Sequence, residues 1–513
     1  MCSEPADTFL WQIGGNMYIQ AWILCSIFIP AAAGLLFLVL PARKMREKKM
    51  SWAAVLALVL TVASVGMLLF SYSRGTKAQL TLFSLTEGLD ISFRLDDLGA
   101  FFLGFIAFIW LLGGIFSVEY LNHEHHKRRF WGFYLLTLCA LQGLSLAGNL
   151  VTMYLFFEMM TLVSMPLVLH TQTHEAVMAG LKYLFYSMCG AYMALFGVFV
   201  FYHFGKSMEF LPGGVMDSAV LAQNGTILHL GIFLMILGFG VKAGMFPMHA
   251  WLPTAHPVAP APASAVLSAI IVKGGVLAVM RSVYYVAGAE LLKGSWVQYA
   301  WLILALITIF LGSMLAFKEP VLKKRLAYSS VSQASYIMLG MAVLNPTALT
   351  GSLLHVLFHA FIKTALFLSA GAVIYQTGYT RVGQLRGIGK EMPVTIWCYT
   401  FVSLALIGIP PASGFISKWY LAEGLLESGV KTFSWLGPVV LLVSALLTAG
   451  YLLPVTIDGF LPGEDYNYQA RKKREPSVKM VLPLIILAAG ALIMGVFPGG
   501  LITFLGNITA AVV

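Results

Sequence analysis

The chain has 513 residues, of which 59% are hydrophobic and only 11% are charged. A soluble globular protein carries about 25% charged residues, so this composition excludes an ordinary soluble domain. The five cysteines show neither CxxC nor iron–sulfur spacing and no nucleotide-binding glycine motif is present, so we expect no metal or other cofactor on this chain.

Apolar runs of about 20 residues recur along the chain, and each is long enough to cross a hydrocarbon core of about 30 Å as a helix. The sequence therefore predicts an all-α polytopic membrane protein with about 14 transmembrane helices. The first run follows an acidic start and is too long for a cleaved signal peptide. The predicted spans are residues 19–40, 52–72, 98–118, 130–148, 150–170, 176–204, 226–246, 259–285, 297–317, 324–344, 350–375, 392–425, 433–455 and 478–498.

Basic residues are distributed unevenly between the two sets of alternating loops. Most of the 32 Lys and Arg residues belong to one set, and only a few belong to the other. Basic loops stay in the cytoplasm, so this asymmetry predicts a cell-membrane protein with both termini outside. The net charge of +10 is then explained by topology rather than by nucleic-acid binding. The basic clusters lie at residues 43–49, 127–129, 318–325, 381–390 and 471–479.

Two predicted spans are interrupted by prolines and glycines. The first break, GMFPMHAWLPTAHPVAPAP, follows Lys242, and the second, GIPPASG, precedes Lys418. Unwound backbone inside a membrane is tolerated only within protein or against a cavity. Broken helices at corresponding places in two halves indicate a transport site and inverted repeats, although the halves share no strong residue identity. The predicted parts are 1–129 (helices 1–3), 130–296 (first repeat, broken helix 7), 297–456 (second repeat, broken helix 12) and 457–513 (C-terminal loop and last helix).

Several charged residues lie inside predicted spans, where each costs at least about 2.5–3.5 kcal/mol on insertion scales. Such residues mark an ion or proton path unless they only pair with one another. They are Glu158, Lys182, Lys242, Lys273, Arg281, Lys363 and Lys418.

Glu158, Lys242 and Lys273 are the strongest candidates among them. Burial brings the pKa of a lysine toward neutrality, so a buried lysine exchanges protons where arginine does not. Glu158 is then either a gate on a proton path or half of a static ion pair. Lys242 and Lys273 are either proton carriers or structural partners, and the Gly-Gly pair after Lys273 allows close approach of a helix or water.

His355, His359 and Lys363 follow one another at intervals of four residues. They lie on one helical face, along a stripe of about 12 Å. Histidine transfers protons near neutral pH, so the stripe predicts a proton relay. The alternatives are hydrogen-bonded core histidines or a metal site. Lys418 is the candidate outlet, or a structural partner of the second break.

The remaining polar groups have weaker assignments. Lys182 either belongs to the path or extends to the membrane interface. His249 and His256 flank the first break, where they either bind carbonyls freed by it or help proton uptake. Arg281 is expected to be an anchor at the end of its helix. The loop histidines at 123, 125 and 126 are expected to form a solvated turn rather than a metal site.

Four sequence blocks resemble signature segments of one family. They are VKAGMFPMHAWLPTAHPVAPAPASAVLSAIIVKGG, KRLAYSSVSQASYIMLG, HAFIKTALFLSAG and GFISKWYLA. The family is the antiporter-like proton-pumping subunits of respiratory complex I, the Mrp cation/proton antiporters and the group 4 membrane-bound hydrogenases. The resemblance extends from about Leu95 to about Tyr451.

The resemblance implies 14 helices, two inverted five-helix repeats and broken helices seven and twelve. It aligns the predicted residues with a hydrated axis in the membrane plane, through which protons move as a Glu158–Lys242 pair is displaced. Lys418 stands where the middle complex I subunit has glutamate, and no long lateral helix follows the last predicted span. The chain therefore looks closest to the D-type Mrp subunit and its hydrogenase relatives. The implied axis residues are Glu158, Lys242, Lys273, His355, His359, Lys363 and Lys418.

The sequence thus predicts a proton-translocating subunit of a multisubunit complex, driven by redox chemistry or working as an Mrp-type antiporter. Expected partners are other membrane subunits, including sister antiporter-like chains, and candidate iron–sulfur subunits; sodium is a candidate second ion. Any redox catalysis would belong to other chains. One alternative is a structural membrane-arm subunit without its own proton path, and another, an electron-transfer subunit, lacks the necessary motifs.

Overall fold

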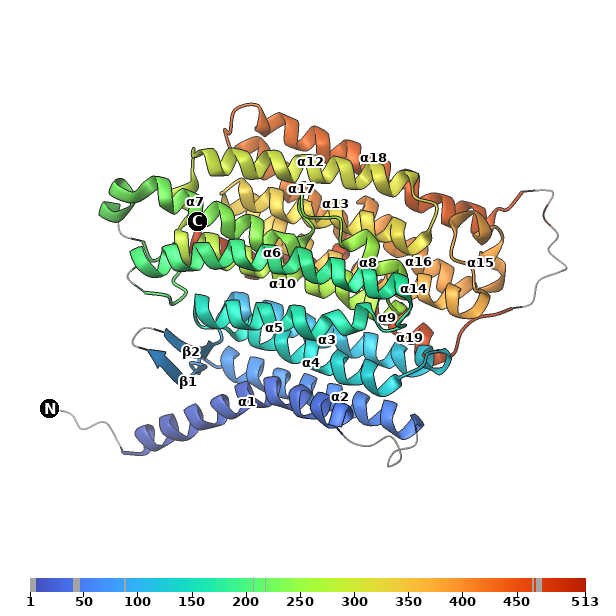
Figure 1. Cartoon of the computed structure of the whole chain (residues 1–513). Coiled ribbons are helices and arrows are strands. Elements are labelled where there is room, and N and C mark those ends of the chain that lie inside the picture. Colours follow the sequence, from blue (N-terminus) through green and yellow to red (C-terminus); the bar gives the residue numbers. More distant parts are fainter. Residues whose placement is uncertain are drawn as a thin grey trace.

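The computed structural model describes residues 6–39, 47–86, 89–205, 207–216, 218–463, 466 and 473–513. Long helices lie side by side, with α1 and α2 along one edge of the bundle and α12 and α18 along the opposite edge (Figure 1). Within the described residues, 11 helical segments are long and apolar enough to cross a membrane. The chain is therefore a predominantly helical, multi-pass membrane protein.

The N-terminal part contains four helices and one β-hairpin. Its helices α2 and α3 pack on each other, and α1 packs on α4. Strand β1 pairs antiparallel with β2, from Gln79 opposite Arg94 to Thr86 opposite Leu89. The elements are α1 (Ala6–Val39), α2 (Glu47–Ser73), β1 (Gln79–Thr86), β2 (Leu89–Arg94), α3 (Asp97–Tyr120), η2 (Leu121–His123) and α4 (Lys127–Leu146).

The middle part contains the first predicted break. Helix α7 ends at Ala243, where Gly244 takes a left-handed conformation with φ of 73°, and regular helix resumes at Leu252. The predicted interruption is therefore confirmed. The elements are α5 (Leu150–Val168), α6 (His174–Phe204), α7 (Ser218–Ala243), α8 (Leu252–Val258), α9 (Ala261–Val266), the π-helical η3 (Leu267–Ile271), α10 (Val272–Met280), the π-helical η4 (Arg281–Ala287) and α11 (Ala289–Leu292).

The C-terminal part contains the second break, which is also confirmed. Helix α16 ends at Ile407, Gly408 has φ of 94°, and α17 begins at Ser413. The elements are α12 (Trp296–Lys318), α13 (Leu322–Ala342), α14 (Pro346–Thr377), η5 (Val382–Leu385), α15 (Ile388–Glu391), α16 (Pro393–Ile407), α17 (Ser413–Glu427), α18 (Phe433–Phe460), α19 (Val478–Val496) and α20 (Gly499–Val512).

The predicted spans correspond closely to these helices. Three of them form helices that are less apolar or shorter than the 11 segments: residues 130–148 lie in α4, 324–344 lie in α13, and 392–425 are divided between α16 and α17. Helix α20, after the last predicted span, was not predicted. Parts of two predicted basic clusters, residues 43–46 and 471–472, lie outside the described residues.

The hairpin corrects the prediction of an all-α chain. Two isolated strands are only marginally stable in water, so the hairpin depends on packing against its surroundings. Asn149, which caps α5, donates from Nδ2 to the Asp90 carbonyl at 2.6 Å and to Ser92 Oγ at 3.0 Å. The Ser92 amide in turn donates to Thr152 Oγ1 at 3.0 Å. These contacts form between segments about 60 residues apart, so the local pattern did not reveal them.

Arg281 is the anchor that its position predicted, and its partner is Asp96 at the start of α3. The guanidinium donates to both carboxylate oxygens, at 2.5 and 2.6 Å, and Asp96 also caps α3 by accepting from the Gly99 amide at 2.8 Å. Burial alone would raise the pKa of Asp96, but the Arg281 charge, together with the hydrogen bonds from Arg281 and Gly99, outweighs burial and holds that pKa below its usual range. The pair joins the hairpin region to η4.

Replacing Asp96 with alanine should destabilise the protein by about 3–5 kcal/mol, because it leaves the buried Arg281 charge unpaired. The thermal midpoint of the purified protein in detergent measures this loss. The matched control is Glu209→Ala, which removes an exposed carboxylate 3.9 Å from Arg94 and should cost less than about 1 kcal/mol. Equal midpoints for the two variants would contradict a stabilising role for the buried pair.

Candidate proton pathway

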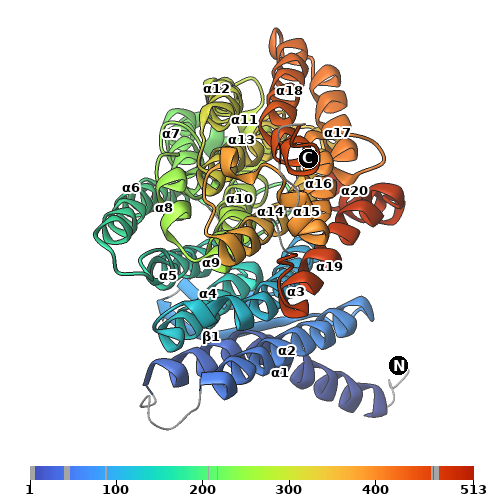
Figure 2. The same ribbon diagram turned by 90° about the vertical axis from the view of Figure 1, so that its right-hand side faces the viewer.

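The predicted relay side chains gather in the interior of the bundle. Figure 2 shows α10 and α14 surrounded by other helices, and α7 packs directly against α10. Their ionisable side chains are shielded from solvent by the protein itself. The buried members are Lys242 on α7, Lys273 on α10, and His355, His359 and Lys363 on α14.

Lys242 is held by hydroxyl groups of α6. Its Nζ donates to Tyr183 Oη at 2.6 Å and to Ser187 Oγ at 2.9 Å. Tyr183 Oη lies 2.7 Å from Ser164 Oγ on α5, so a polar contact continues toward the helix of Glu158. Among the described residues, no carbonyl freed by the break accepts a hydrogen bond from Lys242. The Val241 carbonyl instead accepts from Trp251 Nε1 at 2.8 Å.

Glu158 and Lys242 are not in direct contact. Among the described residues Glu158 forms no ion pair, and its buried Oε1 has no hydrogen-bond partner. The Lys242 charge nevertheless acts on the Glu158 carboxylate through space. The implied ion pair is therefore open in this structure, and a movement of either side chain is needed to close it.

The two glycines after Lys273 bring helices together. A Cβ at Gly275 would lie 2.6 Å from Lys242 Cβ, and one at Gly274 would lie 2.9 Å from Met160 Sδ. Such separations are too short for any larger residue. The sequence predicted that either a helix or water approaches this glycine pair. Helices do so: α7 lies beside Gly275 and α5 lies beside Gly274.

Lys273 and the two histidines make a continuous chain of contacts. Lys273 Nζ contacts His359 Nδ1 and also donates to the Ser268 carbonyl at 3.3 Å, within the π-helical turn. The His359 and His355 rings stack with centroids 5.7 Å apart and an angle of 18°. His355 Nδ1 lies 2.9 Å from Ser417 Oγ on α17. The chain of contacts thus joins α10 to the second broken helix.

In the described part of the chain, the Nε2 atoms of His355 and His359 lack a hydrogen-bond partner. Both atoms are buried. Leaving such an atom unpaired costs about 1–3 kcal/mol. In the described part of the chain no three His, Cys, Asp or Glu side chains come together as metal ligands.

Lys363 turns away from the histidines toward α13. Its Nζ donates to the Leu326 carbonyl at 3.0 Å and to Ser329 Oγ at 2.8 Å. Ser329 also accepts from Tyr451 Oη of α18 at 2.7 Å. The three members of the predicted stripe therefore share a helix but have different neighbours.

Lys418 sits at the second break, as predicted. Its Nζ donates to the freed carbonyls of Leu406 and Ile407, at 2.7 and 2.8 Å. The same ammonium lies 5.3 Å from the ring centroid of Tyr336, whose other neighbour is the His355 ring at 5.5 Å. Tyr336 and Ser417 therefore connect Lys418 to the histidines.

Sequence reasoning missed the hydroxyl groups that hold each lysine. In α13 the pattern AYSSVSQASY repeats serine and tyrosine at helical spacing, which was a usable signal for a polar face toward Lys363. No comparable local signal marked the partners on other helices. The missed residues are Ser164, Tyr183, Ser187, Ser329, Tyr336, Ser417 and Tyr451.

The accessory residues lie on both sides of the first break. Lys182 donates to Thr254 Oγ1 at 3.1 Å, and with His249 and Thr254 it lines a polar cavity of about 460 Å³ that opens to the surface. His249 contacts the Pro247 backbone within the break. His256 is fully buried, and neither ring nitrogen has a hydrogen-bond partner among the described residues, so it binds no freed carbonyl.

Comparison with known families shows to which family the chain belongs. Residues 147–448 match the family described as NADH:quinone oxidoreductase/Mrp antiporter, transmembrane, and residues 85–131 match the N-terminal family of complex I chain 5. The chain belongs to the NADH:quinone oxidoreductase/Mrp antiporter family of membrane subunits.

Individual relatives come from several complexes. The chain is 33% identical to NADH-quinone oxidoreductase subunit N of Desulforudis audaxviator, over 79% of this chain and 82% of the relative. It is 31% identical to F420H2 dehydrogenase subunit N of Methanosarcina mazei, over 86% and 87%. A chain of the Mrp complex of Dietzia sp. has the same fold, with a TM-score of 0.82, 22% identity, and coverage of 96% and 97%. These matches establish the family but do not single out the D-type Mrp subunit.

Proposed function

We propose that this chain conducts protons through the membrane as one subunit of a multisubunit complex. The observation that carries the proposal is the buried, continuous series of contacts from Lys273 through His359 and His355 to Ser417. Each member is either an ionisable side chain or a hydroxyl group that can pass on a hydrogen bond. Tyr336 and Ser417 extend the series to Lys418 at the second break.

The unpartnered histidine nitrogens favour conduction over a purely structural role. A passive bundle gains nothing from buried polar atoms without partners. In a conducting path the same atoms accept and release the transferred proton. The lysines on either side carry the charge between the histidines and the two ends of the path.

The proposed route begins on the cytoplasmic side at the cavity beside Lys182 and His249. The route passes Lys242, whose Nζ is hydrogen-bonded to Tyr183 and Ser187, and then Lys273. The route continues along the histidines of α14 and ends at Lys418. Lys363 stands beside the route rather than within it. Movement of Glu158 toward Lys242 would close their open pair and set the charge on Lys242.

The finer organisation is part of the proposal. We place 14 helices in the membrane, with two inverted five-helix repeats over residues 130–296 and 297–456, between the N-terminal helices 1–129 and the C-terminal part 457–513. The two broken helices, each with a lysine beside its break, support the repeat. The distribution of basic loops supports a cell membrane with both termini outside.

The partners decide what drives the transport. We expect sister antiporter-like chains and small membrane subunits, together with iron–sulfur subunits if redox chemistry drives the transport; no cofactor is assigned to this chain.

Mild-detergent purification followed by mass spectrometry identifies these partners. The complex is then placed in vesicles containing a pH-sensitive dye. Proton movement started by an electron donor, or by a sodium gradient, would support the proposal. A complex that turns over without moving protons would overturn it.

A further inference from the structure

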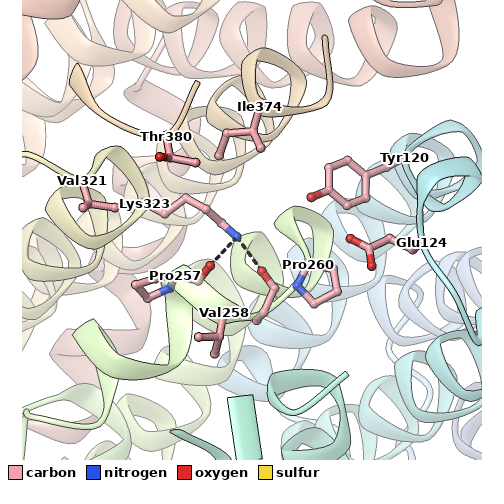
Figure 3. Close-up of a pocket in the computed structure, with 10 residues that line it drawn as sticks. Tyr120, Glu124, Pro257, Val258, Pro260, Val321, Lys323, Ile374 and Thr380 are labelled. Atoms are coloured by element: carbon pink, nitrogen blue, oxygen red, sulfur yellow. Dashed lines mark hydrogen bonds between the residues drawn. The ribbon is translucent and has the colours of Figure 1, made fainter. Parts of the chain in front are cut away.

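A second pocket opens on the same side of the protein as the Lys182 cavity, and no step of the proposed route uses it. Figure 3 shows Lys323 of α13 at its centre, above the backbone of the first break, and Glu124 across the pocket with its carboxylate turned toward Lys323. Its volume is about 190 Å³, which is enough for several water molecules. Tyr120, Ile374 and Thr380 complete the wall.

Lys323 is a buried ammonium bound only to backbone carbonyls among the described residues. Its Nζ donates to Ala259 O at 2.5 Å and to Pro257 O at 3.4 Å, and no carboxylate of the described residues approaches it within 4 Å. The Glu124 charge acts on it across the pocket. Burial raises the pKa of Glu124 above that of an exposed glutamate, although the Lys323 charge opposes this.

His256 lies directly behind the pocket wall, next in sequence to Pro257. It is fully buried, and both ring nitrogens lack a partner in the described part of the protein. The ring stands 4.8 Å from the ring of Phe367, which follows Lys363 by one turn of α14. The charges of Lys323 and of Lys363 both act on it.

We propose that this pocket is a second cytoplasmic entrance, which delivers protons to Lys363 through Glu124, Lys323 and His256. The inference rests on the proposed function, since it adds a second proton-uptake route to the same series of ionisable residues. A proton taken up by Glu124 passes through pocket water to a neutral Lys323 amine. The ammonium then gives a proton to one His256 ring nitrogen, and the other ring nitrogen releases its proton to a neutral Lys363.

The geometry fits a proton-uptake route better than a purely structural role for Lys323 and His256. A lysine that only stabilises the freed carbonyls of the break needs neither water beside it nor an acid facing it. A histidine that only fills space would be replaced without penalty by an apolar side chain. The two cavities share Pro257 and Val258 but have different ionisable residues, so each half of the axis has its own supply: Lys182 and His249 for Lys242, and Glu124 and His256 for Lys363.

The test compares proton translocation by the intact complex in vesicles carrying His256→Phe or Glu124→Gln. Both variants should lose part of their proton translocation and fall to the level of Lys363→Ala, which keeps only the flux that arrives through Lys242 and Lys273. The matched control is Glu119→Gln, on the same end of α3, where the carboxylate pairs with Lys479 instead of facing the pocket. It should transport normally.

The outcomes separate the inference from the function on which it rests. If Lys363→Ala transports less than the native complex while His256→Phe and Glu124→Gln transport normally, the entrance is wrong and the axis stands. If Lys363→Ala itself transports normally, Lys363 needs no supply and the entrance is wrong; the proposed function falls only if the Lys273→Ala/Lys363→Ala double variant also transports normally.

A second measurement covers the case in which the His256 variant fails to assemble. Thr380→Cys places a thiol in the pocket wall, and an anionic, membrane-impermeant thiol reagent added from the cytoplasmic side should block transport. Arg381→Cys, exposed but outside the wall, is the control and should stay active, as should the native protein with its own cysteines. Full transport by labelled Thr380→Cys would overturn the entrance.

Discussion

Replacing Lys242 with alanine is expected to abolish proton translocation while the complex still assembles. The ammonium binds the α6 hydroxyls of Tyr183 and Ser187, and alanine carries no proton. Removing the lysine breaks no direct ion pair, because these two partners are neutral hydroxyls. Those hydroxyls lose about 1 kcal/mol of hydrogen bonding, which a large bundle tolerates.

Glu158→Gln should have the same effect for a different reason. The amide keeps the size of the side chain but cannot acquire the negative charge that acts on Lys242. Proton flux into dye-loaded vesicles measures both variants, and size-exclusion chromatography checks assembly. Lys293→Ala is the control, because that lysine is exposed and pairs only with Glu290. Native flux in both Lys242→Ala and Glu158→Gln would overturn the mechanism.

The second large effect is expected when Lys273 and Lys363 are both replaced with alanine. Lys273 contacts His359 directly, and Lys363 lies one turn beyond on the same helix. Without both lysines the histidines have no cationic neighbour from which to receive a proton inside the bundle, apart from Lys418 at the exit. Proton translocation should therefore be lost, whereas partial flux is expected in each single variant if either lysine still supplies the stripe.

The double variant distinguishes a conductor from a spacer. Its control is Lys318→Ala together with Lys431→Ala, two lysines at loop ends that leave the proposed route intact. Loss of proton flux with normal assembly supports conduction through this chain. Normal flux would support a structural subunit that holds its neighbours in place. The interaction between the two sites is read from the difference between the double variant and the sum of the singles.

Much of the fold was predictable because its signals are local. A run of about 20 apolar residues must become a helix in a bilayer, and a proline-rich interruption must break it. The two breaks after Ala243 and after Ile407 were accordingly predicted within a few residues. The hairpin and α20 were missed: the hairpin is stabilised by Asn149 and Thr152, which lie on another element, and α20 is shorter than a full span.

The sequence by itself determined which ionisable groups are inside the membrane and which of them share a helix, because burial and helical spacing are properties of a single segment. Only the tertiary structure decided what each group touches. Lys242 binds hydroxyls while Lys418 binds freed carbonyls, although both stand beside a break. The Lys242 charge acts on Glu158 without a direct contact, and the charges of Lys323 and Lys363 both act on His256. These relations join helices that are distant in the chain, and they follow from how whole helices pack, which no local pattern encodes.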